Sequence, residues 1–149
     1  MKKIKEYGFS FVEILVVITI IGIIAAIGTV SYTQFLMQSR DAKRKGDLEQ
    51  IRAALEMYKS KNNLYPLSNE IIFGGDLCDP VGGCATGTYL KKIPNDPKTN
   101  SNTYYYQSTT GADYIIGSYL EQGSTSTCGD CDLVGTQTCN YCLGPYGQL

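Results

Sequence analysis

The sequence predicts an α+β fold in which one long N-terminal helix packs against a small antiparallel β-sheet. Three observations support this. Residues 9–30 are almost wholly apolar, residues 31–61 continue at helical spacing, and residues 103–120 hold two strand-like runs around a turn. A helix over residues 9–61 would be about 80 Å long at 1.5 Å per residue. Because a small head cannot bury all of it, we expect the apolar half to protrude.

The apolar segment, residues 9–30, follows a short basic leader, residues 1–8. Its length suits a membrane span, which needs roughly 20 apolar residues. Glu13 lies inside it, where a charge costs on the order of 2.5–3.5 kcal/mol on insertion scales. A plain anchor leaves that charge unexplained. A signal peptide cut near Gly28 would exceed the usual apolar region of about 7–15 residues. A buried helix of a soluble protein is disfavoured by the length and hydrophobicity of the segment. The remaining alternative is cleavage of the chain before residue 9, which would leave the apolar segment in the mature protein.

Residues 31–61 are predicted to form an amphipathic helix that continues into the head. Its apolar side chains recur at helical spacing, with charged residues between them. These apolar residues are Leu48, Ile51, Leu55 and Tyr58. We interpret the charge-rich residues 40–45 as a solvated helical face, or alternatively as a contact to lipid headgroups. Asn62, Asn63 and Pro66 are predicted to end the helix.

Residues 62–149 are predicted to form the globular head. Residues 67–101 carry Gly and Pro turn signals without clear periodicity, which predicts a loop region. Residues 103–120 predict a β-hairpin, which we expect to grow to three or four strands on the helix. At least one of the three consecutive tyrosines at 104–106 should pack in the core. The Cys-rich tail, residues 122–149, has few large apolar side chains with which to order itself.

All the cysteines lie after residue 77, which favours an exported, cross-linked head. They are Cys78, Cys84, Cys128, Cys131, Cys139 and Cys142. We predict disulfides, with Cys78–Cys84 as a local link and the tail closing on itself. Zinc held by the two Cys-x2-Cys pairs is the alternative, although their separation is shorter than the usual 15–20 or so residues. A redox-active pair is disfavoured because no thioredoxin-like pattern surrounds it.

Composition excludes several classes of function. The chain has a formal net charge of −1 and no histidine, which excludes His-based triads and His-ligated zinc. No nucleophile–base pair supports catalysis, so we do not predict an enzyme. Residues 62–149 contain no arginine and more acidic residues than lysines, so no nucleic-acid partner is predicted.

Residues 5–13, Lys-Glu-Tyr-Gly-Phe-Ser-Phe-Val-Glu, resemble the class III leader of type IV pilins and type II secretion pseudopilins. Residues 62–66, 89–97 and 113–118 resemble, more weakly, the helix end, pre-sheet loop and following strand of that family. The resemblance implies a pilin-like fold. It also implies cleavage between Gly8 and Phe9 by the prepilin peptidase, which then N-methylates Phe9. Glu13 would pair with the Phe9 amine of a neighbouring subunit during assembly.

The implied function is a structural subunit of a type IV pilus or type IV pilus-like filament. The alternative is the major pseudopilin of a type II secretion system, and a weaker one is an exported zinc- or ligand-binding module on a signal anchor. Implied partners are further copies of the chain, the prepilin peptidase, an assembly ATPase with its inner-membrane platform, and the membrane. Before assembly the chain would be single-pass in the cytoplasmic membrane with an extracytoplasmic head. The filament would then lie at the cell surface or in the periplasm.

Two departures from the family bear on its expected properties. The family usually has a proline where this chain has Val30, so Gly22 and Gly28 are predicted to supply helix flexibility instead. Major pseudopilins bind calcium near the C-terminal region. The possible oxygen ligands here are Asp113, Glu121, Asp130 and Asp132. Their spacing does not match a calcium loop, so we predict no metal site and no cofactor, with calcium or zinc there left as an unsupported possibility.

Overall fold

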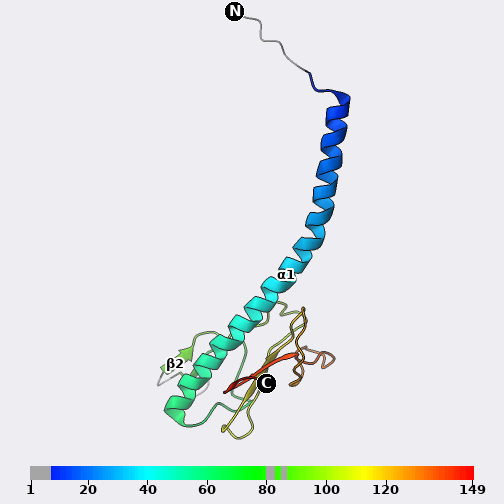
Figure 1. Cartoon of the computed structure of the whole chain (residues 1–149). Helices are drawn as coiled ribbons and strands as arrows, with labels where there is room; N and C mark the ends of the chain where they lie inside the picture. Colours follow the sequence, from blue (N-terminus) through cyan, green and yellow to red (C-terminus); the bar gives the residue numbers. More distant parts are fainter. Residues whose placement is uncertain (1–7, 80–82, 85–86) are drawn as a thin grey trace, which may run out of the picture. The chain divides into compact units, whose positions relative to one another are not determined.

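The long helix α1 (Phe11–Asn62) is the largest element in the described part of the chain (Figure 1). The structure, a computed structural model, describes residues 8–79, 83–84 and 87–149. The predicted leader lies outside this part of the chain except for Gly8. Asn63 ends α1 in the left-handed conformation, with φ 62°, and its N–H donates to the Lys59 carbonyl at 2.8 Å. Asparagine tolerates that conformation well, so the predicted helix end is confirmed.

Two antiparallel sheets accompany α1 in the head. In the smaller sheet, β1 (Leu77–Asp79) pairs with β2 (Gly87–Leu90). The larger sheet has four strands in the order β3-β4-β5-β6, each antiparallel to its neighbour. Its strands are β3 (Tyr105–Gln107), β4 (Ile115–Ser118), β5 (Tyr141–Gly144) and β6 (Gly147–Gln148). The predicted α+β fold and the predicted hairpin in residues 103–120 are confirmed.

The core of the head lies between α1 and the sheet. Leu48, Ile51 and Leu55 are fully buried, and Tyr58 packs against the same cluster, as the helical spacing predicts. On the sheet, the strand register places Tyr106, Ile116 and Leu143 opposite one another in one row across β3, β4 and β5. All three belong to the core, as does Tyr104. The prediction that the tyrosine run contributes to the core is therefore confirmed.

Two segments hold more regular structure than the sequence predicts. Residues 67–101, predicted as a loop region, contain β1 and β2, and the tail supplies β5 and β6. These strands are two to four residues long, too short to show a reliable alternation of polar and apolar residues. Cysteines lie in two of them, Cys78 in β1 and Cys142 in β5, so disulfide bonds support strands whose composition alone would not order them.

Candidate functional site

The N-terminal part of α1 carries a continuous apolar surface. From Phe9 to Ile27, thirteen large apolar side chains are between 46% and 81% exposed. By length and composition this helix can cross a membrane. The chain is helical at both Gly22 and Gly28, and their role in helix flexibility stays a prediction.

Glu13 caps the start of α1. The Glu13 N–H donates to the Ser10 carbonyl at 3.1 Å, and the Ser10 N–H lies 3.5 Å from Oε2 of Glu13. Ser at the cap and Glu three residues later is the spacing of a capping box. This capping role was not among the predictions from the sequence, although the Ser-x-x-Glu pattern of residues 10–13 indicates it. An anion in the first turn also gains roughly 0.3–1 kcal/mol from the helix dipole.

Six charged side chains in the head form a second candidate site, which we call the charge clamp. They come from α1, from the loop after β2 and from the segment that follows β4. The members are Arg40, Asp41, Arg44, Asp96, Lys98 and Glu121. Their ion pairs join three parts of the chain that are distant in sequence. Arg44 and Asp96 are 52 residues apart, Arg40 and Glu121 are 81 apart, and Lys98 and Glu121 are 23 apart.

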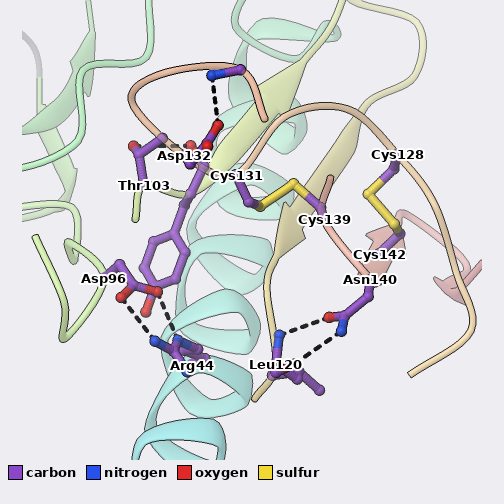
Figure 2. Close-up of a disulfide and its surroundings, with 12 residues drawn as sticks. Arg44, Asp96, Thr103, Leu120, Cys128, Cys131, Asp132, Cys139, Asn140 and Cys142 are labelled. Carbon is purple, nitrogen blue, oxygen red and sulfur yellow. Dashed lines mark hydrogen bonds and ion pairs between the residues drawn. A yellow bond between two sulfur atoms is a disulfide. The ribbon is translucent and has the colours of Figure 1, made fainter. Parts of the chain in front are cut away.

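Arg44 lies at the centre of the charge clamp and is fully buried. Its Nε and Nη2 donate to the two carboxylate oxygens of Asp96 at 2.7 and 3.1 Å (Figure 2). Its Nη1 donates to Asp41 at 2.8 Å and to Glu121 at 3.0 Å. Burial alone would lower the pKa of Arg44, but the hydrogen bonds and charge of Asp96, together with the hydrogen bonds to Glu121 and Asp41, raise the pKa above its ordinary value.

Glu121 connects the segment after β4 to the two other parts of the clamp. Arg40 donates to it from Nε and Nη2, both at 2.7 Å, and Lys98 Nζ lies at 2.9 Å. The hydrogen bond from Arg40 is the largest cause that holds the pKa of Glu121 well below its ordinary range. The Asp41 carboxylate accepts the backbone N–H groups of Glu121 and Gln122, both at 2.9 Å.

The charge clamp corrects the interpretation of residues 40–45 as a solvated helical face in part, because Ala42, Lys43 and Lys45 are exposed as expected and the other three residues are not. Asp41 and Arg44 are buried, and Arg40 is held by Glu121. The physical reason is that Arg44 precedes Leu48 by one helical turn and therefore lies on the face that packs into the head. The same contacts direct Arg40 and Arg44 toward the head, which also removes them from the alternative role at lipid headgroups.

The six cysteines form three disulfides. The pairs are Cys78–Cys84, Cys128–Cys142 and Cys131–Cys139, and Figure 2 shows the last two side by side. The predicted local link and the closure of the tail on itself are confirmed. Every cysteine sulfur is in a disulfide, which leaves no thiolate to bind zinc in this oxidised form. Gly117 of β4 lies against both tail disulfides, because a Cβ there would be 2.6 Å from Sγ of Cys128 and 3.2 Å from Sγ of Cys139.

The possible calcium ligands do not form one site. Glu121 faces three cations, and the Asp132 carboxylate accepts N–H groups of Gly135 and Thr136 within its own turn. The Asp113 carboxylate accepts the N–H of Tyr114. Within residues 8–79, 83–84 and 87–149, no group of three or more acidic or sulfur ligands could hold a metal ion. The residues present therefore do not fit the calcium ion that the resemblance implies.

Two family models match this chain in adjoining segments. The model of the prokaryotic N-terminal methylation motif matches residues 3–29. The model of type II secretion system protein G matches residues 31–136, which is more than half of the chain. The chain belongs to the type II secretion system protein G family. This confirms the resemblance to the pilin and pseudopilin families and makes the chain a member of a family of structural pseudopilins.

Sequence identity to individual proteins also places this chain among the protein G pseudopilins. The type II secretion system core protein G of Pseudomonas aeruginosa is 31% identical over 87% of this chain and 96% of its own length. The protein of that name from Vibrio cholerae is 27% identical over 87% of this chain and 93% of its own length. The type IV major pilin protein PilA of Myxococcus xanthus is 33% identical over only 46% of this chain and 32% of its own length. No solved structure matches the chain significantly. The relatives therefore favour the type II secretion alternative over the type IV pilus expectation.

Proposed function

We propose that this chain is the major pseudopilin of a type II secretion system and acts as a structural subunit, not as an enzyme. It would wait in the cytoplasmic membrane as a single-pass protein and then polymerise into a periplasmic filament. The observation that carries the proposal is the division of α1. Its first part exposes apolar side chains throughout, whereas residues from Asp41 onward pack into a folded head.

The apolar segment requires a partner for energetic reasons. Burying one Val, Leu, Ile or Phe side chain fully is worth about 1.5–3 kcal/mol. Thirteen such side chains between Phe9 and Ile27 are 46–81% exposed, so leaving them in water forgoes on the order of 10–20 kcal/mol. Lipid can cover them before assembly, and the helices of sister subunits can cover them in a filament.

The charge of Glu13 makes the lipid environment less favourable for the apolar segment than a filament in which the charge is paired. Capping and the helix dipole offset part of the cost of placing this carboxylate in a membrane, roughly 0.3–1 kcal/mol against about 2.5–3.5 kcal/mol. A cation is needed for the rest. Cleavage between Gly8 and Phe9 would create an amine at Phe9 that stays protonatable after N-methylation. Pairing with this amine on a neighbouring subunit would neutralise Glu13, and an assembly ATPase and membrane platform would drive the step.

Mass spectrometry of the purified mature chain tests the processing step. We expect a chain that begins at Phe9, carries one methyl group and lacks two mass units for each of three disulfides. A chain that begins at Met1 or after Gly28 would refute the cleavage proposal.

Glu13→Gln tests the pairing, because glutamine keeps the capping hydrogen bond and removes only the charge. We expect unchanged amounts of the protein in the membrane and a large loss of filaments pelleted from disrupted cells. Glu49→Gln is the matched control, since Glu49 is an exposed carboxylate of the same helix paired with Arg52 at 3.0 Å. A normal filament yield from Glu13→Gln would contradict the proposed role.

A further inference from the structure

The charge clamp contains a cation that belongs to the chain itself. Arg44 is the most enclosed member, with no exposed surface, and its guanidinium contacts three carboxylates at 2.7–3.1 Å. Those carboxylates are Asp41, Asp96 and Glu121, each from a different part of the head. Although three carboxylates meet here, no group of three or more acidic side chains among the described residues is placed to hold a metal ion. A guanidinium lies between these carboxylates instead.

All six carboxylate oxygens of the clamp already accept hydrogen bonds. In Asp41, Oδ1 accepts Arg44 and the Glu121 N–H, and Oδ2 accepts the Gln122 N–H. In Asp96, Oδ2 accepts Arg44 and Oδ1 accepts both Arg44 and the Lys98 N–H. In Glu121, Oε1 accepts Arg40 and Arg44, and Oε2 accepts Arg40 and Lys98.

The charges of the clamp also balance. Three cations, Arg40, Arg44 and Lys98, face three carboxylates. A divalent ion entering this set would add two uncompensated positive charges in a largely buried site, which is strongly unfavourable. The observed contacts of 2.7–3.1 Å suit N–H···O bonds from a planar guanidinium, whereas calcium needs oxygens at about 2.3–2.6 Å.

We propose that Arg44 is the built-in cation of this head, so that the three joined segments close and stay closed without calcium or any other divalent ion. The head would therefore stay folded when a chelator removes divalent ions. This property would hold whatever the function of the filament. The C-terminal segment is fixed on one side by the clamp at Glu121 and on the other by two disulfides.

Thermal unfolding of the full mature chain in a non-ionic detergent tests the proposal. The near-UV circular dichroism of the head reports tertiary packing through its tyrosines, since the chain has 12 tyrosines and no tryptophan. We expect the same midpoint after treatment with excess EDTA and after addition of millimolar calcium. A midpoint that falls with EDTA and returns with calcium would overturn the proposal, and this wild-type comparison needs no variant to fold.

Substitution at the centre supplies the second test. Arg44→Met keeps much of the volume, removes the cation and leaves three carboxylates together, so we expect the midpoint to fall by about 10–20 °C. Arg44→Lys keeps the positive charge but lacks the planar guanidinium, so its unfolding midpoint should lie between those of the wild-type chain and the Arg44→Met variant. Arg52→Met is the matched control, an arginine of the same helix in a partly exposed pair with Glu49. Equal midpoints for the Arg44→Met and Arg52→Met variants would overturn the role of Arg44, whatever the outcome for secretion.

Discussion

Gly117 of β4 offers the sharpest test of how the tail is held. A Cβ at this position would lie 2.6 Å from Sγ of Cys128 and 3.0 Å from Cβ of Cys139. Contacts shorter than 3.0 Å force a shift, and a disulfide sulfur cannot rotate away because it is bonded at both ends. Overpacking of this kind costs about 1–3 kcal/mol. Replacing a glycine also restricts the unfolded chain, which returns about 0.4–1 kcal/mol, so we expect Gly117→Ala to be destabilising overall.

Gly144 of β5 provides a matched control in the same sheet. A Cβ there would meet its nearest neighbours at 3.5 Å or more, which is ordinary contact. Gly144→Ala should therefore be neutral or slightly stabilising, because only the effect on the unfolded chain remains. Urea unfolding of the two variants, followed by near-UV circular dichroism under oxidising conditions, gives the two free energies of unfolding. Equal stability of the two variants would refute the steric reasoning.

A double-mutant cycle identifies the disulfide as the obstacle at Gly117. In a background carrying Cys128→Ala and Cys142→Ala, the nearest sulfur is gone, and the penalty of Gly117→Ala should shrink. The expected coupling is about 0.5–3 kcal/mol, the range found for residues in direct contact. A penalty that is unchanged in this background would show that the Cys139 side chain, and not the Cys128–Cys142 disulfide, resists the added methyl group.

Two further predictions concern the loss of stability at low pH and the hydrogen bonds of the Asn140 side chain. The pKa of Glu121 is lowered in the folded head, chiefly by Arg40, so its contribution to stability is complete above its unfolded pKa of about 4.3 and is lost as pH falls below about 4. Urea midpoints should fall between pH 5 and pH 3, and Glu121→Gln should flatten that slope; an equal slope would contradict the assignment. Asn140 accepts from the Leu120 N–H at 2.7 Å and donates to its carbonyl at 2.9 Å. Asn140→Asp loses the donor and should cost about 1–3 kcal/mol in urea unfolding, whereas Asn100→Asp, at an exposed position, should cost little.

The long helix and the hairpin were predictable because each carries its own periodic signal. Leu48, Ile51 and Leu55 repeat at the spacing of one helical face, and Asn63 can take the left-handed conformation that ends α1. The cysteine pairing was also predictable in outline. Close spacing favours local links, and a tail with few large apolar side chains needs covalent support to order itself.

The composition of residues 40–45 does not predict the charge clamp, because the position of Arg44 in the head follows from helical phase and not from residue type. Arg44, Leu48, Ile51 and Leu55 lie four, three and four residues apart, so Arg44 continues the buried stripe. That phase was a usable signal that a charge enters the head. The partners were not predictable, because Asp96 and Glu121 lie 52 and 77 residues away and meet Arg44 only through the fold.

The head and the apolar segment are stabilised by different kinds of contact. The head closes through contacts that the chain makes with itself, namely the apolar core, the charge clamp and the disulfides. The exposed apolar side chains between Phe9 and Ile27 are not part of that core, so under the proposed function their free energy depends on lipid or on other copies of the chain. Under the proposed function, a substitution in the clamp lowers the fraction of folded heads and so lowers assembly indirectly. Under the same proposal, neutralising Glu13 should leave the unfolding midpoint of the head unchanged and should act on polymerisation alone. These two defects are separable because no residue of the charge clamp lies within the apolar segment.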